Sequence, residues 1–168
     1  MKKTFYFLSF SFFISLFLGC GIYSFTGGNT GKAKTIQIDY FPNQASLVEP
    51  IVGQKFTEDL QDLFLRQTNL SLVKNNGDLH FQGEIVNYMI RPMGATANET
   101  AAQNRLTVTV NIRYTNRFKE EDDFEKQFSH YEDYNANILL SGSSLEDILN
   151  IIFERITQDV FNASVAKW

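Results

Sequence analysis

Leu106-Thr107-Val108-Thr109-Val110-Asn111-Ile112-Arg113-Tyr114 is the stretch that decides the fold of this chain. An apolar residue stands at every second position, and each residue between them is polar. Because successive side chains of a β-strand point to opposite faces, this alternation predicts a strand with one buried face and one face in water. Strands of this kind are typical of antiparallel sheets whose second face is solvated.

Residues 34–41 and 79–90 are two further strand candidates. The first alternates apolar and polar side chains and is closed by Pro42. In the second, the alternation runs cleanly as far as Ile85-Val86, where the apolar phase slips. A slip inside one strand predicts a β-bulge. The sequence Asn75-Asn76-Gly77-Asp78 before it predicts a tight turn, since Asn and Gly accept positive φ.

Two weaker strand candidates lie at residues 70–73 and 124–134. The second would also fit a helical face, and we expect it to form a strand that pairs back onto residues 106–114. Residues 119–123 are expected to form a charged turn before it. Residues 91–103 are rich in Ala, Thr and Asn and are expected to form a loop.

A first helix is predicted from Ser46, because Glu49 three residues later completes a capping box and Pro50 is tolerated in the first turn. The helix is expected to end near Thr68-Asn69. Gly53 is its weak point, at a cost of roughly 1 kcal/mol relative to Ala. Its apolar stripe consists of Leu47, Ile51, Val52, Phe56, Leu60, Leu63 and Phe64.

A second capping box, Ser143 with Glu146, predicts the start of the last helix. Its apolar stripe consists of Leu145, Ile148, Leu149, Ile152, Phe153, Ile156, Val160 and Phe161. Two amphipathic helices that bracket a set of amphipathic strands predict an α+β fold. We expect a two-layer sandwich, with both helices on one face of a mostly antiparallel sheet of four to five strands.

The first nineteen residues have the features of a secretory signal peptide. Lys2 and Lys3 form a basic head, an apolar run covers residues 5–18, and Gly19 is a small residue at the expected cut. The run is shorter than the roughly 20 residues of a membrane-spanning helix. We therefore expect residues 1–19 to be removed from the mature protein.

Cys20 is the only cysteine, so no intrachain disulfide can form. Its position resembles the bacterial lipobox, although Phe17 and Leu18 depart from the usual pattern. The alternative is a small apolar residue that ends a hydrophobic stretch. The resemblance implies a diacylglycerol and an N-acyl chain on Cys20, which together hold a protein stably on a membrane. Gly21, where an Asp would favour the inner membrane, favours the periplasmic face of the outer membrane.

The predicted mature chain has two parts. Residues 20–32 are rich in Gly, Ser and Thr and are expected to form a flexible tether. Residues 33–168 are expected to form a single domain, since a chain of this size buries enough surface for a core of its own. The whole chain has a net charge of −4 and no basic cluster, which argues against nucleic acid as a partner.

The sequence contains no motif for nucleotide binding or nucleophilic catalysis. With Cys20 acylated, neither thiol catalysis nor a cysteine zinc site is possible. His80 is predicted to be a solvated side chain on the outer face of its strand, and His130 is either ordinary or a pH-sensitive contact. The acidic residues 120–123 lack the spaced ligands of a calcium loop. We expect no enzyme, no metal and no cofactor other than the lipid.

Four segments together resemble the LptE family of lipopolysaccharide-assembly lipoproteins, of the type found in Bacteroidetes. They are residues 20–25, 77–85, 104–108 and 159–168. The resemblance implies two helices on a four-stranded sheet, one strand fewer than the five strand candidates above. It also implies a plug and folding partner for the LptD β-barrel, which inserts lipopolysaccharide into the outer leaflet of the membrane.

Lipopolysaccharide carries phosphate groups, which cationic side chains recognise. Arg91, Arg105 and Arg113 are therefore candidate contacts, with ordinary solvated charges as the alternative. Two other functions stay open from the sequence. One is an accessory lipoprotein of a different envelope machine, such as a pilotin. The other is a lipid-anchored hydrolase, which would require a nucleophile and base for which the sequence shows no motif.

Overall fold

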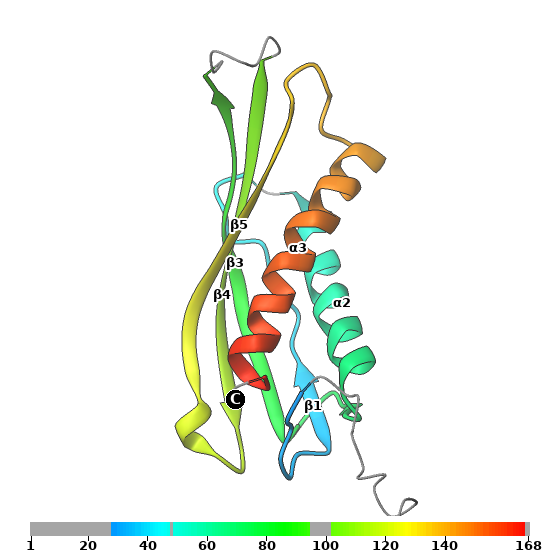
Figure 1. The fold of residues 1–168 in the computed structure, drawn as a ribbon, viewed down its shortest axis with the longest axis vertical. Helices are drawn as coiled ribbons and strands as arrows, with labels where there is room; N and C mark the ends of the chain where they lie inside the picture. The colour runs from blue at the N-terminus through cyan, green and yellow to red at the C-terminus, as the bar shows by residue number, and fades with distance from the viewer. Residues whose placement is uncertain (1–27, 48, 95–101, 167–168) are drawn as a thin grey trace, which may run out of the picture.

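The computed structural model describes residues 28–47, 49–94 and 102–166. These residues form a five-stranded sheet in the order β2-β1-β3-β4-β5, with two helices packed over one face (Figure 1). The predicted α+β sandwich is confirmed. The strands are β1 (Thr35–Ile38), β2 (Ser71–Leu72), β3 (Leu79–Met93), β4 (Gln103–Asn116) and β5 (Phe124–Asn135). The helices are α2 (Pro50–Gln67) and α3 (Ser143–Ser164), and a 3₁₀ turn, η2 (Glu120–Asp122), precedes β5.

The sheet is antiparallel on one side and parallel on the other. β4 pairs with β3 and β5 in antiparallel registers along nearly its whole length. β1 instead runs parallel to both β2 and β3. The family resemblance implied four strands, and the fifth is the two-residue β2. The alternation in β4 is confirmed, because Leu106, Val108, Val110 and Ile112 are fully buried and Tyr114 is 1% exposed.

The phase slip in β3 is a β-bulge, as predicted. The register against β4 shifts between Ile85 and Asn87. At the same place the segment before α2 joins β3, because the Ile85 N–H donates to the Pro42 carbonyl and the Gln44 N–H donates to the Ile85 carbonyl. The bulge brings Ile85 and Tyr88 onto the same buried face.

The predicted capping boxes are wrong for both helices. α2 begins at Pro50 with Glu49 as its cap residue, so Ser46 and Leu47 lie outside the helix and Leu47 is exposed. Pro50 has no N–H that would require a cap and already has a helical φ, which explains the later start. α3 begins after Gly142, whose positive φ only glycine adopts readily, and the Glu146 N–H donates to the Gly142 carbonyl.

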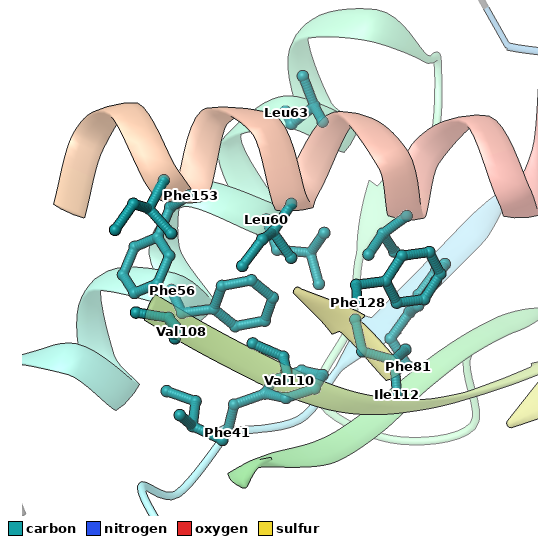
Figure 2. Close-up of a cluster of buried hydrophobic side chains, with 14 of the residues drawn as sticks. Phe41, Phe56, Leu60, Leu63, Phe81, Val108, Val110, Ile112, Phe128 and Phe153 are labelled. Atoms are coloured by element: carbon teal, nitrogen blue, oxygen red, sulfur yellow. The ribbon is translucent and has the colours of Figure 1, made fainter. Parts of the chain in front are cut away.

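Aromatic rings fill the space between the helices and the sheet (Figure 2). Phe56 of α2 lies 5.1 Å from Phe41 and 5.3 Å from Phe153 of α3, measured between ring centroids. Phe64 of α2 similarly contacts Phe81 of β3 at 4.9 Å. All eight apolar positions predicted for the last helix are buried. The apolar stripes therefore placed both helices correctly. The start of α2 was predicted too early, whereas α3 begins at Ser143 as predicted, with Gly142 as its cap residue.

The β3–β4 hairpin is longer than predicted. The ladder continues to the pair Met93 and Gln103, so residues 91–93 and 103 are strand and not loop. Residues 94 and 102 lie outside both strands, and residues 95–101 of the expected loop lie outside the described residues. Backbone pairing carries the two strands beyond their apolar positions, because a hairpin ladder needs no buried side chains to satisfy its hydrogen bonds. We call this end of the molecule the tip.

The opposite end, which we call the base, is where the described chain starts. There the Asn29 N–H donates to the Val165 carbonyl at the end of α3, at 2.7 Å. The Asp78 carboxylate accepts hydrogen bonds from the Lys34 and Thr35 N–H groups, which holds the start of β1. Contacts with the domain therefore begin inside the predicted tether over residues 20–32. The predicted signal peptide and Cys20 lie outside the described residues.

Candidate binding surface

The sheet face that points away from the helices is polar along its whole length. We call it the polar face and define it by the outward side chains of the three long strands. They are His80, Gln82, Glu84, Asn87, Met89 and Arg91 of β3, Arg105, Thr107, Thr109, Asn111 and Arg113 of β4, and Glu125, Gln127, Ser129, Tyr131 and Asp133 of β5. This face carries all three arginines that the sequence analysis selected.

Arg105 is engaged by two residues of β5. Its Nε and Nη2 donate to the two carboxylate oxygens of Asp133 at 2.7 and 2.8 Å, a two-pronged ion pair. Its guanidinium carbon lies 3.7 Å from the centroid of the Tyr131 ring, which adds a cation–π contact. The Arg105 hydrogen bond holds the pKa of Asp133 below its ordinary value. Arg105 is thereby positioned and its charge balanced.

The charge of Arg113, which lies nearer the base, is balanced in the same way. Its Nε and Nη2 both donate to Glu125 Oε2, at 3.1 and 3.0 Å. Asn111 joins the pair, since its amide donates to Glu125 and also to Glu84. The hydrogen bond from Asn111, together with Arg113, lowers the pKa of Glu125. About 27 Å of strand separates Arg113 from Arg105, so the structure does not bring the three arginines together.

Arg91 lies directly opposite Arg105 in the β3–β4 ladder, near the tip. It is exposed, and its Nε donates to the sulfur of Met89 at 2.8 Å. Among the described residues, no carboxylate forms an ion pair with Arg91. Of the three predicted contacts, Arg91 is therefore the one whose charge is not balanced by a described neighbour.

The two histidines occupy different faces. His80 lies on the polar face, as predicted, but it is not simply solvated, because its Nε2 is 2.8 Å from Asp39 Oδ2. His130 lies on the helix side, with Nε2 2.7 Å from Asp159 Oδ2 of α3. Burial raises the pKa of Asp39, but hydrogen bonds from Gln37 and His80 outweigh that effect and lower the pKa overall. Both histidines thus join separate elements of the fold.

A side chain of α3 covers part of the outer edge of β5. Arg155 of α3 donates from Nη1 to the backbone carbonyl of Tyr131 at 3.0 Å and forms an ion pair with Glu132 at 2.9 Å. A guanidinium bound at this carbonyl lies where an incoming strand would have to pair, and it hinders that pairing. This stretch of the sheet edge is therefore protected against strand addition.

Within the described residues no group of three or more His, Cys, Asp or Glu side chains could hold a metal ion. No helix of the described residues is long and apolar enough to cross a membrane. Cys20, the predicted lipid attachment site, lies outside the described residues.

A family model for lipopolysaccharide-assembly proteins, LptE, matches residues 33–164. The chain belongs to the LptE family. The match covers both helices and all five strands, and it agrees with the resemblance found in the sequence. LptE proteins are lipopolysaccharide-assembly lipoproteins and not an enzyme family, which places the chain among the membrane-associated lipoproteins of the cell envelope. No curated protein matches the chain.

Solved structures share the fold at very low sequence identity. An uncharacterised lipoprotein B from Nitrosomonas europaea is 13% identical, with a TM-score of 0.50 over 85% of this chain and 88% of its own. A hypothetical protein from Chlamydia trachomatis is 11% identical, with a TM-score of 0.50 over 80% of this chain and 99% of its own. These similarities show the LptE-type fold alone.

Sequence reasoning missed the residues that balance the arginines. Asp133, Glu125 and Tyr131 were read only as strand residues, although both charge pairs fall in a single antiparallel register of β4 against β5. Placing Arg105 opposite Asp133 also places Arg113 opposite Glu125. Opposite charges on neighbouring strands stabilise their pairing. The fact that one register satisfies both charge pairs could therefore have predicted them from the sequence.

Proposed function

We propose that the mature protein is an outer-membrane lipoprotein, anchored on the periplasmic face through acyl chains on Cys20. In this proposal it plugs an LptD-type β-barrel and assists the assembly of that barrel, which inserts lipopolysaccharide into the outer leaflet. The LptE family match over residues 33–164 is the observation that carries the proposal. The fold and the polar face support it.

A plug must be stiff and must present a surface that is stable in a water-filled lumen. The polar face meets both needs, because its charges are tied across strands by the Arg105–Asp133 and Arg113–Glu125 pairs. The edge of β5 is covered by Arg155 at Tyr131, which opposes a partner that binds by strand addition there. A partner that surrounds the domain and contacts side chains is therefore favoured.

Isolation of a tagged full-length chain from native membranes tests the partner. The expected result is co-isolation of one large β-barrel with the lipid-anchored chain. Recovery of a secretin ring would instead support a pilotin, and recovery of no barrel would contradict the proposal. A tagged lipoprotein of unrelated fold from the same membrane serves as the control for nonspecific capture.

Arg91 is the proposed contact for a lipopolysaccharide phosphate, because it is exposed and has no carboxylate partner among the described residues. Arg105 and Arg113 would have to leave Asp133 and Glu125 to serve the same role. Arg91→Gln is expected to weaken binding of lipopolysaccharide by about tenfold or more, the usual effect of losing a hydrogen bond to a charged group. Arg113→Gln is the matched control, and equal losses in both variants would contradict this assignment.

A further inference from the structure

The part of β5 nearer the base forms an open edge of the sheet. In an antiparallel ladder, alternate residues direct their backbone groups away from the paired strand. Tyr131 is one of these residues, since its carbonyl accepts from Arg155 on the outer side. In steps of two residues, Ser129, Gln127 and Glu125 therefore also direct their N–H and C=O groups outward. All three are exposed, and the yellow half of β5 that carries them forms the left margin of the molecule in Figure 1.

The register on the other side of β4 agrees with this alternation. Ile85 of β3 directs its backbone groups to the segment before α2, away from β4. Val110, which is paired with Ile85, therefore bonds to Phe128 of β5. Phe128 thus faces inward, and the residues on either side of it face outward. Among the described residues, no hydrogen bond reaches the outward backbone groups between residues 125 and 129. We call residues 125–129 the free edge, and such an edge is a template for another strand.

We propose that two copies of this chain pair through the free edge, with their β5 strands antiparallel about a two-fold axis at Gln127. Each Gln127 stands opposite the Gln127 of the second copy, and Glu125 stands opposite Ser129 of the second copy. Each of these pairs exchanges two backbone hydrogen bonds, so the two sheets become continuous. The free edge is short, so this interface is smaller than the standard size and its pairing is reversible.

The side chains of the free edge select this register over its neighbours. A shift of two residues in one direction places Lys126 directly opposite Lys126 of the second copy, and like charges opposite each other destabilise a sheet. A shift in the other direction requires Tyr131 to pair, although Arg155 already occupies its carbonyl. In the proposed register Lys126 stands opposite Phe128 of the second copy. A lysine at this position already lies 5.1 Å from the Phe128 ring of its own chain, so the contact between copies has the same chemistry.

Charge complementarity beyond the free edge points to a second copy as the occupant. The same register brings Tyr131 of one copy opposite Asp123 of the other. Arg155 lies on the outer side of Tyr131, so its guanidinium faces the exposed Asp123 carboxylate and the acidic turn η2 of the second copy. The two-fold axis repeats this contact at the other end of the interface. A strand from a different protein would have to supply both carboxylates and the register by its own sequence.

The position of the axis determines how the two copies lie. Gln127 is close to the start of β5, which is at the base of the domain. The two bases therefore meet near the axis, and the two tips point in opposite directions. A β-barrel that encloses one domain leaves no room for the second copy. Under the proposed function, the dimer is accordingly the form of the chain outside the barrel, and its formation needs neither the barrel nor lipopolysaccharide.

Disulfide trapping of the full chain in native membranes tests the register. Gln127→Cys places two thiols opposite each other across the axis, at the Cα separation of about 5.5 Å that a disulfide accepts. Ser129→Cys is the matched control on the same face of the same strand, because its two copies lie about 13 Å or more apart. The unsubstituted chain corrects for any disulfide through Cys20. We expect mild oxidation to give a covalent dimer of Gln127→Cys and none of Ser129→Cys.

A mixture of variants sharpens this test. Glu125→Cys alone should give no dimer, whereas Glu125→Cys expressed together with Ser129→Cys should give a covalent dimer that joins the two variants. No covalent dimer of Gln127→Cys, equal dimer yields for Gln127→Cys and Ser129→Cys, or a disulfide to a different protein would overturn the proposal.

Gln127→Pro tests the backbone pairing itself. The Gln127 N–H points outward, so proline removes a hydrogen bond to the second copy and none to β4, and proline is tolerated on edge strands. Sedimentation equilibrium of the full chain in density-matched detergent measures the dissociation constant of the dimer. We expect Gln127→Pro to raise it about thirtyfold or more, and Gln127→Ala, which loses only the side chain, to raise it less than about fivefold.

Equal dissociation constants for Gln127→Pro and Gln127→Ala would contradict pairing through the backbone, and a monomeric unsubstituted chain would overturn the dimer. Disulfide trapping decides the question independently if Gln127→Pro lowers the melting temperature. Co-isolation of the β-barrel is measured separately, so failure of the dimer leaves the proposed plug function intact.

Discussion

Replacing Gly53 with Ala tests whether helix propensity or packing decides the stability of α2. Propensity alone predicts a gain of about 1 kcal/mol, because glycine is a poor helix former. The structure predicts the opposite sign. A Cβ atom at Gly53 would lie 2.5 Å from the backbone carbonyl oxygen of Phe41 and 2.8 Å from the Tyr40 hydroxyl. Both distances are below the range that real Cβ atoms show, so the neighbouring chain would have to move.

The segment around Phe41 cannot move freely. The Phe41 N–H donates to Thr57 Oγ1 at 3.1 Å, and Thr57 Oγ1 donates to the Gly53 carbonyl at 2.8 Å. The Phe41 ring is fully buried against Phe56. Overpacking usually costs about 1–3 kcal/mol, and a clash with a tethered backbone carbonyl belongs to the upper part of that range, about 2–3 kcal/mol. After the gain in helix propensity is subtracted, we expect a net loss of roughly 1–2 kcal/mol in the free energy of unfolding.

Thermal unfolding followed by far-UV circular dichroism measures this change. For a domain of this size the expected loss lowers the melting temperature by about 2–8 °C. Gln54→Ala, at the next and exposed position of α2, is the matched control and should change the free energy by no more than about 0.5 kcal/mol. A melting temperature that rises in Gly53→Ala would refute the packing argument.

Three further perturbations follow from the same structure. Ile152→Asp, at a fully buried position of α3, should lower the free energy of unfolding by about 3 kcal/mol or more, as measured by urea unfolding. Ile151→Asp, at the neighbouring position that is 38% exposed, should lower it by less than about 1 kcal/mol. Similar losses in the two variants would contradict the assigned helix face. Backbone hydrogen bonds, the one from Lys34 foremost, lower the pKa of Asp78 in the folded state. The ionised Asp78 therefore stabilises the fold above its ordinary pKa of 3.8, and this stabilisation is lost as the pH falls below that value. Asp78→Asn should therefore flatten the acid side of a stability–pH curve, and an unchanged curve would show that these bonds contribute nothing. Cys20→Ala should leave an uncleaved precursor without lipid, and intact mass spectrometry that finds the wild-type mature mass would exclude the lipobox.

Periodic patterns predicted the parts of the fold that burial controls. The alternation in β4, the phase slip at Ile85 and the stripe of α3 all correspond to buried positions in the structure. These features are readable because a side chain that enters the core must be apolar, whatever its partners are. The same physics explains why the order of the layers could be predicted without knowing any long-range pairing.

Helix starts and strand pairings were less predictable because they depend on the neighbouring chain. The capping-box pattern at Ser46 fits the sequence, but Asn43 instead organises the approach to α2 by accepting from the Ala45 N–H and donating to the Leu47 carbonyl. The alternation of residues 34–41 likewise does not predict that β1 pairs with β3 in parallel. Parallel and antiparallel strands share the same period of two, so the pattern cannot distinguish them.

The length of the β3–β4 hairpin also determines which residue lies next to Arg91. Arg91 in a loop would have no definable neighbour, whereas in the ladder it stands directly across from Arg105. Two like charges opposite each other destabilise a sheet, and Asp133 offsets only one of them because it is held in a two-pronged pair by Arg105. An anion bound at Arg91 would remove the remaining imbalance. The extended ladder therefore favours Arg91 over Arg113, whose charge Glu125 already balances, as the place on the polar face where a phosphate group would bind.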